Sequence, residues 1–415
     1  MKSRLPAFLI SAFALAPLCA PAQDAPVPAQ PVPAASSQDA PVPAQAVPAE
    51  SASSSGGKKI VIELPELPTS EDVRLKFTGL VQAQYVYATA SGGGAGDRDG
   101  FSLRRTILGV SAELGDDWSA KLTYEFDSTQ EGGSADNGYV DTATISRKFG
   151  SAGTLSVGHK KAHFMLEEYS PSSQFPCLER SINSNFVTNN VYARGLSGSH
   201  IGVYWEGKIP RGGDYGFSLT NAVAKDYDRR SNDLAVTGYF GGTLKLSDGA
   251  QLYFGLNGTV NFGDDGVPPG VDGSSSSALT NAGTVYGVEP YVRFTSGGLM
   301  LLADAFFIDG SSSSRLDPFY GVNLTGTFRF DNGFEPALRF TYLNTDSGLV
   351  NASVQNRVPD SGGFNNAATY YAGVNYYFNK YVKLAVGYEY GHYFGGGSVS
   401  SADSGAFRTM LQVSF

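Results

Sequence analysis

The sequence is poor in the residues from which catalytic sites and cross-links are usually built. Its 415 residues include only two cysteines and four histidines. The histidines stand in no Gly-x-Ser-x-Gly, His-Glu-x-x-His or Cys/His metal-binding pattern; they are His159, His163, His200 and His392. Cys19 lies in an N-terminal segment that we expect to be removed, which leaves Cys177 without a partner for an internal disulfide. We therefore expect no enzyme, metal or cofactor, and a packed rather than reactive Cys177.

Positive charge and long apolar runs are also scarce. The formal net charge is -9, which disfavours a nucleic-acid partner because such proteins carry a basic surplus. The apolar run from Phe8 to Leu18 is shorter than the roughly 20 residues of a transmembrane helix, and no later stretch is apolar enough for one. A basic start precedes this run, and Ala20-Pro21-Ala22 follows it. Residues 1–22 are therefore predicted to be a secretory signal peptide.

Proline dominates the next segment, residues 23–72. The octamer QDAPVPAQ occurs twice, at 23–30 and 38–45. Proline fits neither a helix interior nor a sheet ladder, so we expect a disordered, extended Pro/Ala-rich linker in the periplasm. An inert spacer is the simpler interpretation, and a tether that touches the cell wall is the alternative.

From residue 73 onward, apolar and polar side chains alternate with a period of two, which indicates strands. In the stretch 252–262, for example, Leu252, Phe254 and Leu256 alternate with Tyr253, Gly255 and Asn257. Sixteen segments of this kind are predicted: 74–89, 101–115, 118–128, 138–148, 154–161, 199–208, 214–225, 234–247, 251–262, 283–296, 299–309, 318–331, 334–344, 366–379, 381–393 and 405–415.

The connections between these segments are alternately short and long, as in a bacterial outer-membrane barrel. The fold class is therefore all-β, with a 16-stranded antiparallel transmembrane β-barrel over residues 73–415. Lipid offers backbone groups no hydrogen bonds, so a sheet survives there only when it closes. A soluble β-sandwich is the alternative, but many of these segments run 10–15 residues, and aromatic residues gather near their ends.

The last predicted strand, "GAFRTMLQVSF", must pair with the first to close the barrel. Phe407, Thr409, Leu411, Val413 and Phe415 share its apolar face. The terminal Phe415 resembles the signal that the bacterial outer-membrane insertion machinery reads. We expect the protein in the outer membrane of a Gram-negative bacterium, in contact with its lipid and lipopolysaccharide.

Sixteen strands leave an aqueous channel, which predicts a pore. The longest connection, at about 162–198, is rich in Leu, Phe and Tyr, and we expect it to fold into the lumen as a constriction. Bases exceed acids modestly on the faces opposite the apolar stripes. This basic set comprises Lys76, Arg105, Lys121, Lys208, Lys245, Arg293, Arg329, Arg339, Lys383 and Arg408, with Lys160 at the end of the fifth strand.

Two stretches resemble the phosphate-selective porin O and P family. They are "DGFSLRRTILGVSAELGDDWSAKLTYEFDS" at 99–128 and "YVDTATISRKFGSAGTLSVGHKKAHFMLEEYSPSSQFPCLERS" directly after "DNG". The resemblance implies a trimeric outer-membrane channel that passes anions, including phosphate or polyphosphate, along a line of arginines. By match to the family's motif, the arginine pair falls on Arg104 and Arg105. Alternation puts Arg105 in the lumen and Arg104 near the outer rim, and Lys121 matches the lumen-facing base in the next strand.

The predicted function is passive diffusion of small anions, with phosphate or polyphosphate as the expected solute. Guanidinium groups suit phosphate because they form two-pronged contacts with its oxygens. The residues expected to contact the solute are Arg104, Arg105, Lys121, Lys160, Arg180, Arg194, Arg293, Arg329 and Arg339. The sequence departs from the family in "KKAHFMLEE", which carries two acids, so a porin for general or other solutes stays open. A surface adhesin or structural anchor is the second alternative.

Overall fold

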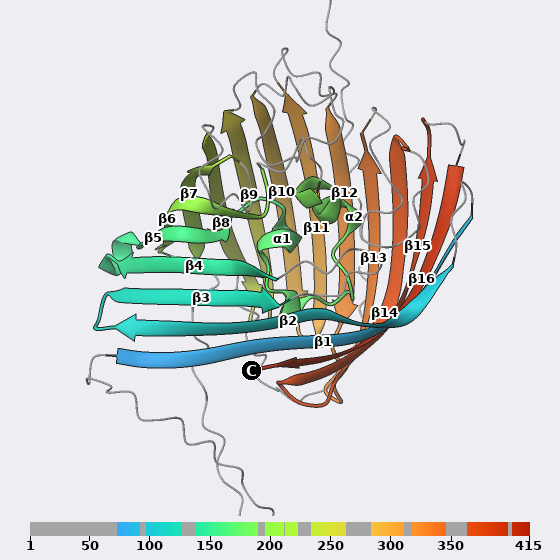
Figure 1. Cartoon of the computed structure of the whole chain (residues 1–415), viewed down its shortest axis with the longest axis horizontal. Helices are drawn as coiled ribbons and strands as arrows, with labels where there is room; N and C mark the ends of the chain where they lie inside the picture. Colours follow the sequence, from blue (N-terminus) through green and yellow to red (C-terminus); the bar gives the residue numbers. More distant parts are fainter. Residues whose placement is uncertain are drawn as a thin grey trace, which may run out of the picture. The chain divides into compact units, whose positions relative to one another are not determined.

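A computed structural model describes residues 73–91, 97–126, 138–189, 196–210, 212–222, 234–262, 284–310, 318–345, 363–396 and 401–415. The predicted signal peptide and linker lie outside these ranges. The described residues form one closed antiparallel barrel in which each strand pairs with its neighbours in sequence and the last strand pairs with the first (Figure 1). The sixteen-stranded barrel predicted from the alternation is confirmed.

The strand bounds follow the predicted segments closely. They are β1 Val73–Ser91, β2 Arg98–Leu114, β3 Trp118–Phe126, β4 Tyr139–Lys148, β5 Thr154–Lys161, β6 Ser199–Ile209, β7 Gly213–Asn221, β8 Leu234–Ser247, β9 Ala250–Phe262, β10 Val285–Ser296, β11 Leu299–Gly310, β12 Phe319–Phe328, β13 Phe334–Asn344, β14 Asn366–Tyr377, β15 Val382–Phe394 and β16 Ser401–Ser414. The clearest difference is β16, which begins four residues before its predicted start at 405.

The two rims of the barrel differ in their connections. Short turns join each even-numbered strand from β2 to β14 to the strand that follows it. We call this end of the barrel the short-turn rim. The opposite end, with the longer connections, is the long-loop rim. In outer-membrane barrels the short turns face the periplasm, which orients the molecule.

Barrel closure depends on β1 and β16. Their register pairs Leu80 with Ser414 and Ser91 with Asp403. At the short-turn rim, Gly79 and Phe415 exchange two backbone hydrogen bonds of 2.9 and 3.1 Å. The last strand therefore closes the cylinder as predicted, while recognition of Phe415 by an insertion machinery stays a prediction.

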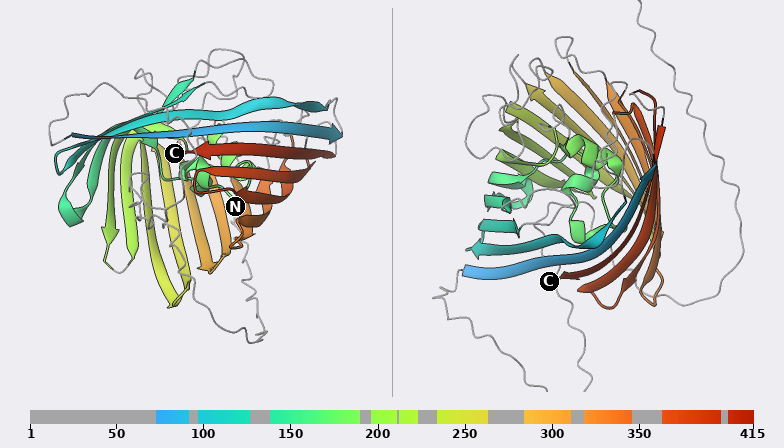
Figure 2. Two further views of the ribbon diagram at one scale, coloured as in Figure 1. Left: turned by 90° about the horizontal axis from the view of Figure 1, so that it is seen from below. Right: turned by 45° about the vertical axis from the view of Figure 1, so that its right-hand side comes forward.

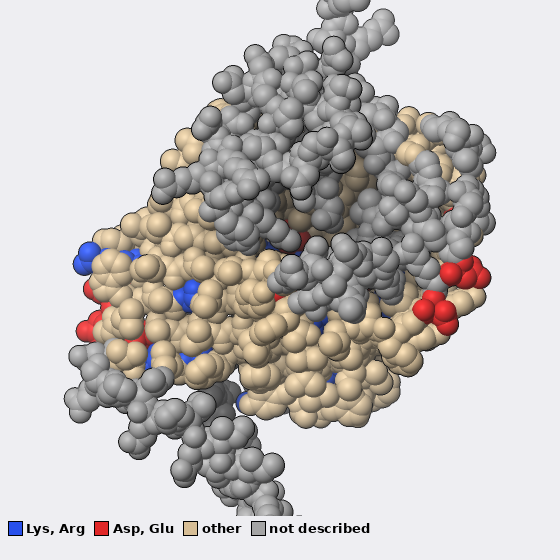
Figure 3. Space-filling model, viewed as in Figure 1, with Lys and Arg blue, Asp and Glu red and all other residues tan. Residues whose placement is uncertain are grey.

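Side chains divide between an apolar outer face and a polar inner face. Large apolar residues that point outward are exposed, among them Ile145, Leu338 and Phe407. On the inner face of the same strands, polar residues such as Thr144, Arg339 and Arg408 are buried. The visible part of the described wall consists mostly of uncharged residues (Figure 3). This is the division expected when the outside contacts lipid and the inside contacts water.

The predicted constriction loop contains short helices. They are α1 Leu166–Tyr169, the 3-10 turn η2 Ser172–Gln174 and α2 Ile182–Asn189, and a further 3-10 turn, η1 Gly150–Ala152, lies between β4 and β5. Both further views show α1 and α2 enclosed by the curve of the sheet rather than outside it (Figure 2). None of the helices in the described ranges is long and apolar enough to cross a membrane.

Candidate pore constriction

The described part of the predicted loop, residues 162–189, crosses the inside of the barrel and is called the inner segment below. It begins at β5 and first reaches β10, where the backbone N–H of Leu166 donates to Glu289 Oε1 at 2.7 Å. Its middle part meets three consecutive strands. Asn375, Lys383 and Gln412 donate to backbone carbonyl oxygens within residues 173–176 at 2.8, 2.9 and 3.0 Å. The segment therefore touches walls on several sides of the lumen, as a constriction must.

Arg339 of β13 is a buried anchor of the inner segment. Its guanidinium donates to the backbone oxygen of Glu179 at 2.7 Å and lies 3.3 Å from Glu167 Oε1. A second nitrogen lies 3.2 Å from Glu389 Oε1 on β15. Only 1% of the Arg339 side chain is exposed, so its charge is neutralised by these two carboxylates and not by water.

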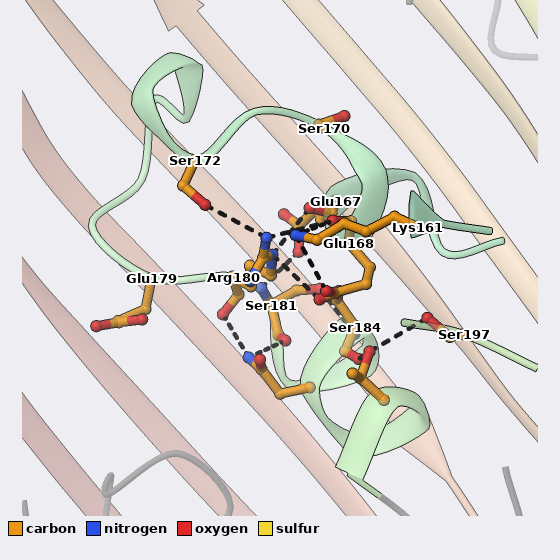
Figure 4. Close-up of polar contacts among 12 residues, drawn as sticks. Lys161, Glu167, Glu168, Ser170, Ser172, Glu179, Arg180, Ser181, Ser184 and Ser197 are labelled. Carbon is orange, nitrogen blue, oxygen red and sulfur yellow. Dashed lines mark hydrogen bonds and ion pairs between the residues drawn. The ribbon is translucent and has the colours of Figure 1, made fainter. Parts of the chain in front are cut away.

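The other two carboxylates of the inner segment are also paired with bases. Glu179 accepts two hydrogen bonds from Arg104, 2.6 Å from Nε and 2.9 Å from Nη2. Glu168 lies 3.3 Å from Lys161 and 3.4 Å from Arg180. Arg180 sits at the centre of this group in Figure 4, while Glu179 points away from it. The acids that the sequence places in the loop thus hold the loop in position.

The ion pairs determine the protonation of these acids. Burial alone raises the pKa of Glu179, but the charge and hydrogen bonds of Arg104, aided by Arg105, outweigh it and hold that pKa well below its usual range. Burial likewise raises the pKa of Glu168, and the charges of Arg180 and Lys161 lower it below its usual value. Both carboxylates are therefore ionised at neutral pH.

An apolar cluster holds the rest of the inner segment against β10–β16. Phe164, Ile182, Phe186 and Val187 from the segment pack with apolar residues near the long-loop ends of these strands. The strand side of the cluster comprises Val285, Phe306, Ile308, Phe319, Leu343, Phe364, Ala367, Tyr393 and Ala402. This part of the lumen is consequently filled by side chains, so the lumen is narrower than the strand number alone implies.

Cys177 belongs to a second, smaller cluster. It packs with Leu178, Ala337, Tyr371, Ala385 and Met410, and it is 5% exposed. Burial raises the pKa of its thiol to about 12. The thiol is therefore a packed apolar group, as expected, because its reactive thiolate form is disfavoured.

Several of the predicted solute-binding bases form ion pairs with carboxylates of the protein itself. Arg104, Arg180 and Arg339 pair with the inner segment's acids as described above. Lys160 donates to both oxygens of Glu206 at 2.8 and 2.9 Å, and His163 Nε2 lies 2.6 Å from the same carboxylate. These bases stabilise the constriction rather than presenting an unpaired charge to a solute.

The orientation predicted for Arg104 is wrong. Gln82 pairs with Arg105 and Ala83 with Leu103, so Arg104 is an extra residue in a β-bulge of β2. A bulge interrupts the two-residue period, and both arginines consequently face the inside. Arg105 is 4% exposed, and its Nη1 donates to the amide oxygen of Gln82 at 2.9 Å.

The remaining predicted bases are spread along the barrel. Lys121 lies on the inner face of β3 and pairs in register with Ser111 of β2. Arg293 lies 5.4 Å from the ring centre of Tyr253, and Arg329 lies 3.8 Å from that of Tyr377. Arg194 lies outside the described residues. The structure therefore does not gather the eight predicted residues that it describes into one site.

A feature that the sequence analysis missed is where the inward bases lie along the barrel. Nine inward positions at or within three residues of the short-turn ends carry a base: Arg74, Lys76, Lys121, Lys148, Lys208, Lys245, Arg293, Arg329 and Lys383. Four inward positions in the same zone carry an acid: Glu113, Glu206, Asp214 and Glu335. The zone is about 10 Å deep at about 3.3 Å per residue. Counting charges by distance from the short turns would have found this surplus in the sequence.

Residues 75–271 match the family model described as phosphate-selective porin O and P. This match confirms the family resemblance found in the sequence. The family match over this part of the chain and the closed barrel together make the chain a porin of the Gram-negative outer membrane, with a channel fold that is not enzymatic. A search of curated protein sequences found no match.

Solved structures of other porins share the fold at low sequence identity. The outer-membrane channel DcaP of Acinetobacter baumannii is 15% identical, with a TM-score of 0.55, over 85% of this chain and 100% of that one. An anion-selective porin from Comamonas acidovorans is 12% identical, with a TM-score of 0.54, over 83% and 100%. The trimer form of OmpT from Vibrio cholerae is 14% identical, with a TM-score of 0.51, over 83% and 100%.

Proposed function

We propose that this porin conducts small anions by passive diffusion and that phosphate is among its solutes. The observation that supports this most is the surplus of bases on the inner face near the short-turn rim, where inward bases outnumber inward acids by nine to four. Fixed charges that line a pore lower the entry cost of ions of opposite sign. The family description and the anion-selective porin of the same fold point in the same direction.

Arg105 is the residue through which the constriction favours anions. The three acids of the inner segment are used in ion pairs, whereas the partner of Arg105 Nη1 is the neutral amide of Gln82. The charges of Arg104 and Arg180 act on Arg105 more strongly than the opposing charges of Glu179 and Glu125. A guanidinium in such surroundings attracts an anion, and phosphate oxygens suit its paired N–H donors.

The test is the reversal potential of single channels in a planar bilayer under a KCl gradient. We expect chloride to be preferred over potassium, and Arg105→Gln to reduce that preference at least about twofold, since even a charge about 10 Å from an ion in water has that effect. Lys380→Gln is the matched control, because Lys380 lies in a short turn over the ring of Tyr381, 4.8 Å from its centre. A preference for potassium in the wild-type channel would remove the proposal.

Phosphate needs a separate measurement. Phosphate added at constant KCl should reduce the chloride current of the wild-type channel, because the two anions compete for the same bases. If the channel prefers chloride but phosphate leaves the current unchanged, it is a porin for general anions. A reversal potential near zero would favour the alternative of a porin without charge selectivity.

We also propose that three copies of the chain assemble. The support is the shared fold with OmpT of Vibrio cholerae, whose structure is a trimer form. Native mass spectrometry of the protein in mild detergent should show three chains per particle. A single chain per particle, at concentrations where the barrel stays folded, contradicts this proposal and leaves the conduction proposal unaffected.

A further inference from the structure

A row of outward-facing residues near the short-turn rim contains one cation among aromatic and aliphatic neighbours. The register aligns Trp118 with Arg147, Arg147 with Leu155, Leu155 with Trp205 and Trp205 with Phe217 across β3–β7. Thr144 and Ser146 are buried on the inner face of β4. Arg147 alternates with them and therefore lies on the outer face together with Ile145, which is 60% exposed. Aromatic rows of this kind mark the boundary between lipid tails and water.

Two exposed rings contact the guanidinium of Arg147. Its central carbon lies 5.3 Å from the ring centre of Trp118 and 5.0 Å from that of Phe149. Trp205 extends the group, with its ring centre 5.6 Å from that of Phe149. The rings favour the cation electrostatically and fix its position, but they accept few of its five N–H hydrogen bonds.

The N–H groups of Arg147 are available to an anion from outside the protein. No carboxylate of the described residues forms an ion pair with Arg147, in contrast to Arg104, Arg180 and Arg339. Arg147 is the second-to-last residue of β4, at the short-turn rim, and therefore lies at the level of the phosphate groups of the periplasmic leaflet. Charge complementarity at this depth therefore points to a phosphate-bearing partner.

The next row away from the rim is aliphatic and exposed. The register aligns Ile145, Val157, Val203 and Leu219, whose exposed fractions are 60, 52, 43 and 41%. A ligand that lies on this wall must therefore have an anionic head at Arg147 and an apolar body over these side chains. A glycerophospholipid has this arrangement, with its chains pointing from the rim toward the bilayer centre.

We propose that Arg147, held between Trp118 and Phe149, binds the phosphate of a glycerophospholipid in the periplasmic leaflet. The guanidinium donates to two phosphate oxygens, and the acyl chains lie over the aliphatic row. The site lies on the outer wall, so it is independent of the solute path and of the proposed anion selectivity.

The experiment is native mass spectrometry of the delipidated porin in detergent, titrated with phosphatidylglycerol. We expect one tightly held lipid per chain and about a tenfold weaker apparent affinity in Arg147→Gln, because a charge-assisted, two-pronged contact is lost. Arg147→Lys should bind with intermediate affinity, since lysine keeps the charge but not the paired donors. Diacylglycerol, which lacks the phosphate, should not be retained.

Arg74→Gln is the matched control. Arg74 lies at the same rim but on the inner face, 3.8 Å from Glu113, so its loss should leave the lipid count unchanged. Equal affinity of the wild type and Arg147→Gln, or equal losses in Arg147→Gln and Arg74→Gln, would overturn the site. A change in the number of chains per particle without a change in lipid count would show that a second copy covers this wall, which also overturns it.

Discussion

At the scale of single residues, Gly158 of β5 is a position where a side chain does not fit. Its φ is 137°, outside the regions that residues with a Cβ adopt readily, and a Cβ there would meet the carbonyl oxygen of Ala143 and lie 3.0 Å from Cα of Thr144. Both neighbours are backbone atoms of β4 and cannot move aside. We expect Gly158→Ala to lower the free energy of unfolding by about 1–3 kcal/mol, measured by urea unfolding in lipid vesicles.

Gly238 of β8 provides the control for this prediction. A Cβ at Gly238 would lie 3.7 Å from its nearest neighbour, the carbonyl oxygen of Gly216, which is an ordinary contact distance. Gly238→Ala should therefore unfold at the same urea concentration as the wild type or slightly above it. Equal destabilisation by the two substitutions would mean that the backbone geometry at Gly158 is not the cause.

The arginine pair shows what alternation can and cannot predict about one residue. Alternation correctly places Arg105 on the inner face, because Gln82 on β1 is its partner in register. It misplaces Arg104, because nothing in the local pattern "SLRRT" signals an extra residue. The bulge becomes visible only when the partner strand is known, so it is a property of the pairing and not of the sequence of one strand.

At the scale of elements, the inner segment was predicted from its length and its apolar content, but its contacts were not. Glu167 and Arg339 are 172 residues apart in the chain, and Asn375 and Pro176 are 199 apart. A sequence can place both signs of charge on inward faces, yet it cannot say which acid meets which base. The consequence for function is large, because these pairs remove three predicted bases from the solute path.

The docking of the inner segment against the barrel wall should depend on pH in a defined direction. The folded-state pKa values of Glu168 and Glu179 lie below the usual carboxyl value of about 4.3. Their ionised forms therefore stabilise the docked segment at every pH above that value, and the stabilisation is lost as the pH falls through the folded pKa. We expect the contribution of these two ion pairs to the docking, followed as a change in single-channel conductance, to be lost only below about pH 4.

Arg104→Gln tests the cause of this pH dependence. Without Arg104, burial is the dominant influence on Glu179 and raises its pKa, so the change in conductance should begin at a higher pH than in the wild type. Lys380→Gln, which removes a charge remote from the inner segment, should keep the wild-type profile. A profile in Arg104→Gln that matches the wild type would show that this ion pair does not control the docking.

At the scale of the whole molecule, the barrel was predictable because closure in lipid allows few solutions. The alternation, the sixteen segments and the alternating loop lengths each follow from a sheet that must satisfy every backbone group and present an apolar face to lipid. The solute preference is less predictable for a physical reason. It depends on how unpaired charge is distributed along the lumen, and that distribution appears only after the ion pairs of the constriction are known.

The distribution of charge gives a prediction for the intact channel. Most of the bases near the short-turn rim are exposed to water, whereas Lys383 is buried against the inner segment, so most of them act on ions through water. Such an influence is screened over about 10 Å at 0.1 M salt and about 3 Å at 1 M. The preference for chloride should therefore fall severalfold between these KCl concentrations, measured as the permeability ratio from reversal potentials at a fixed gradient. A ratio independent of salt would assign the selectivity to direct contact at Arg105 instead, because a buried, close contact is screened far less than charges that face open water.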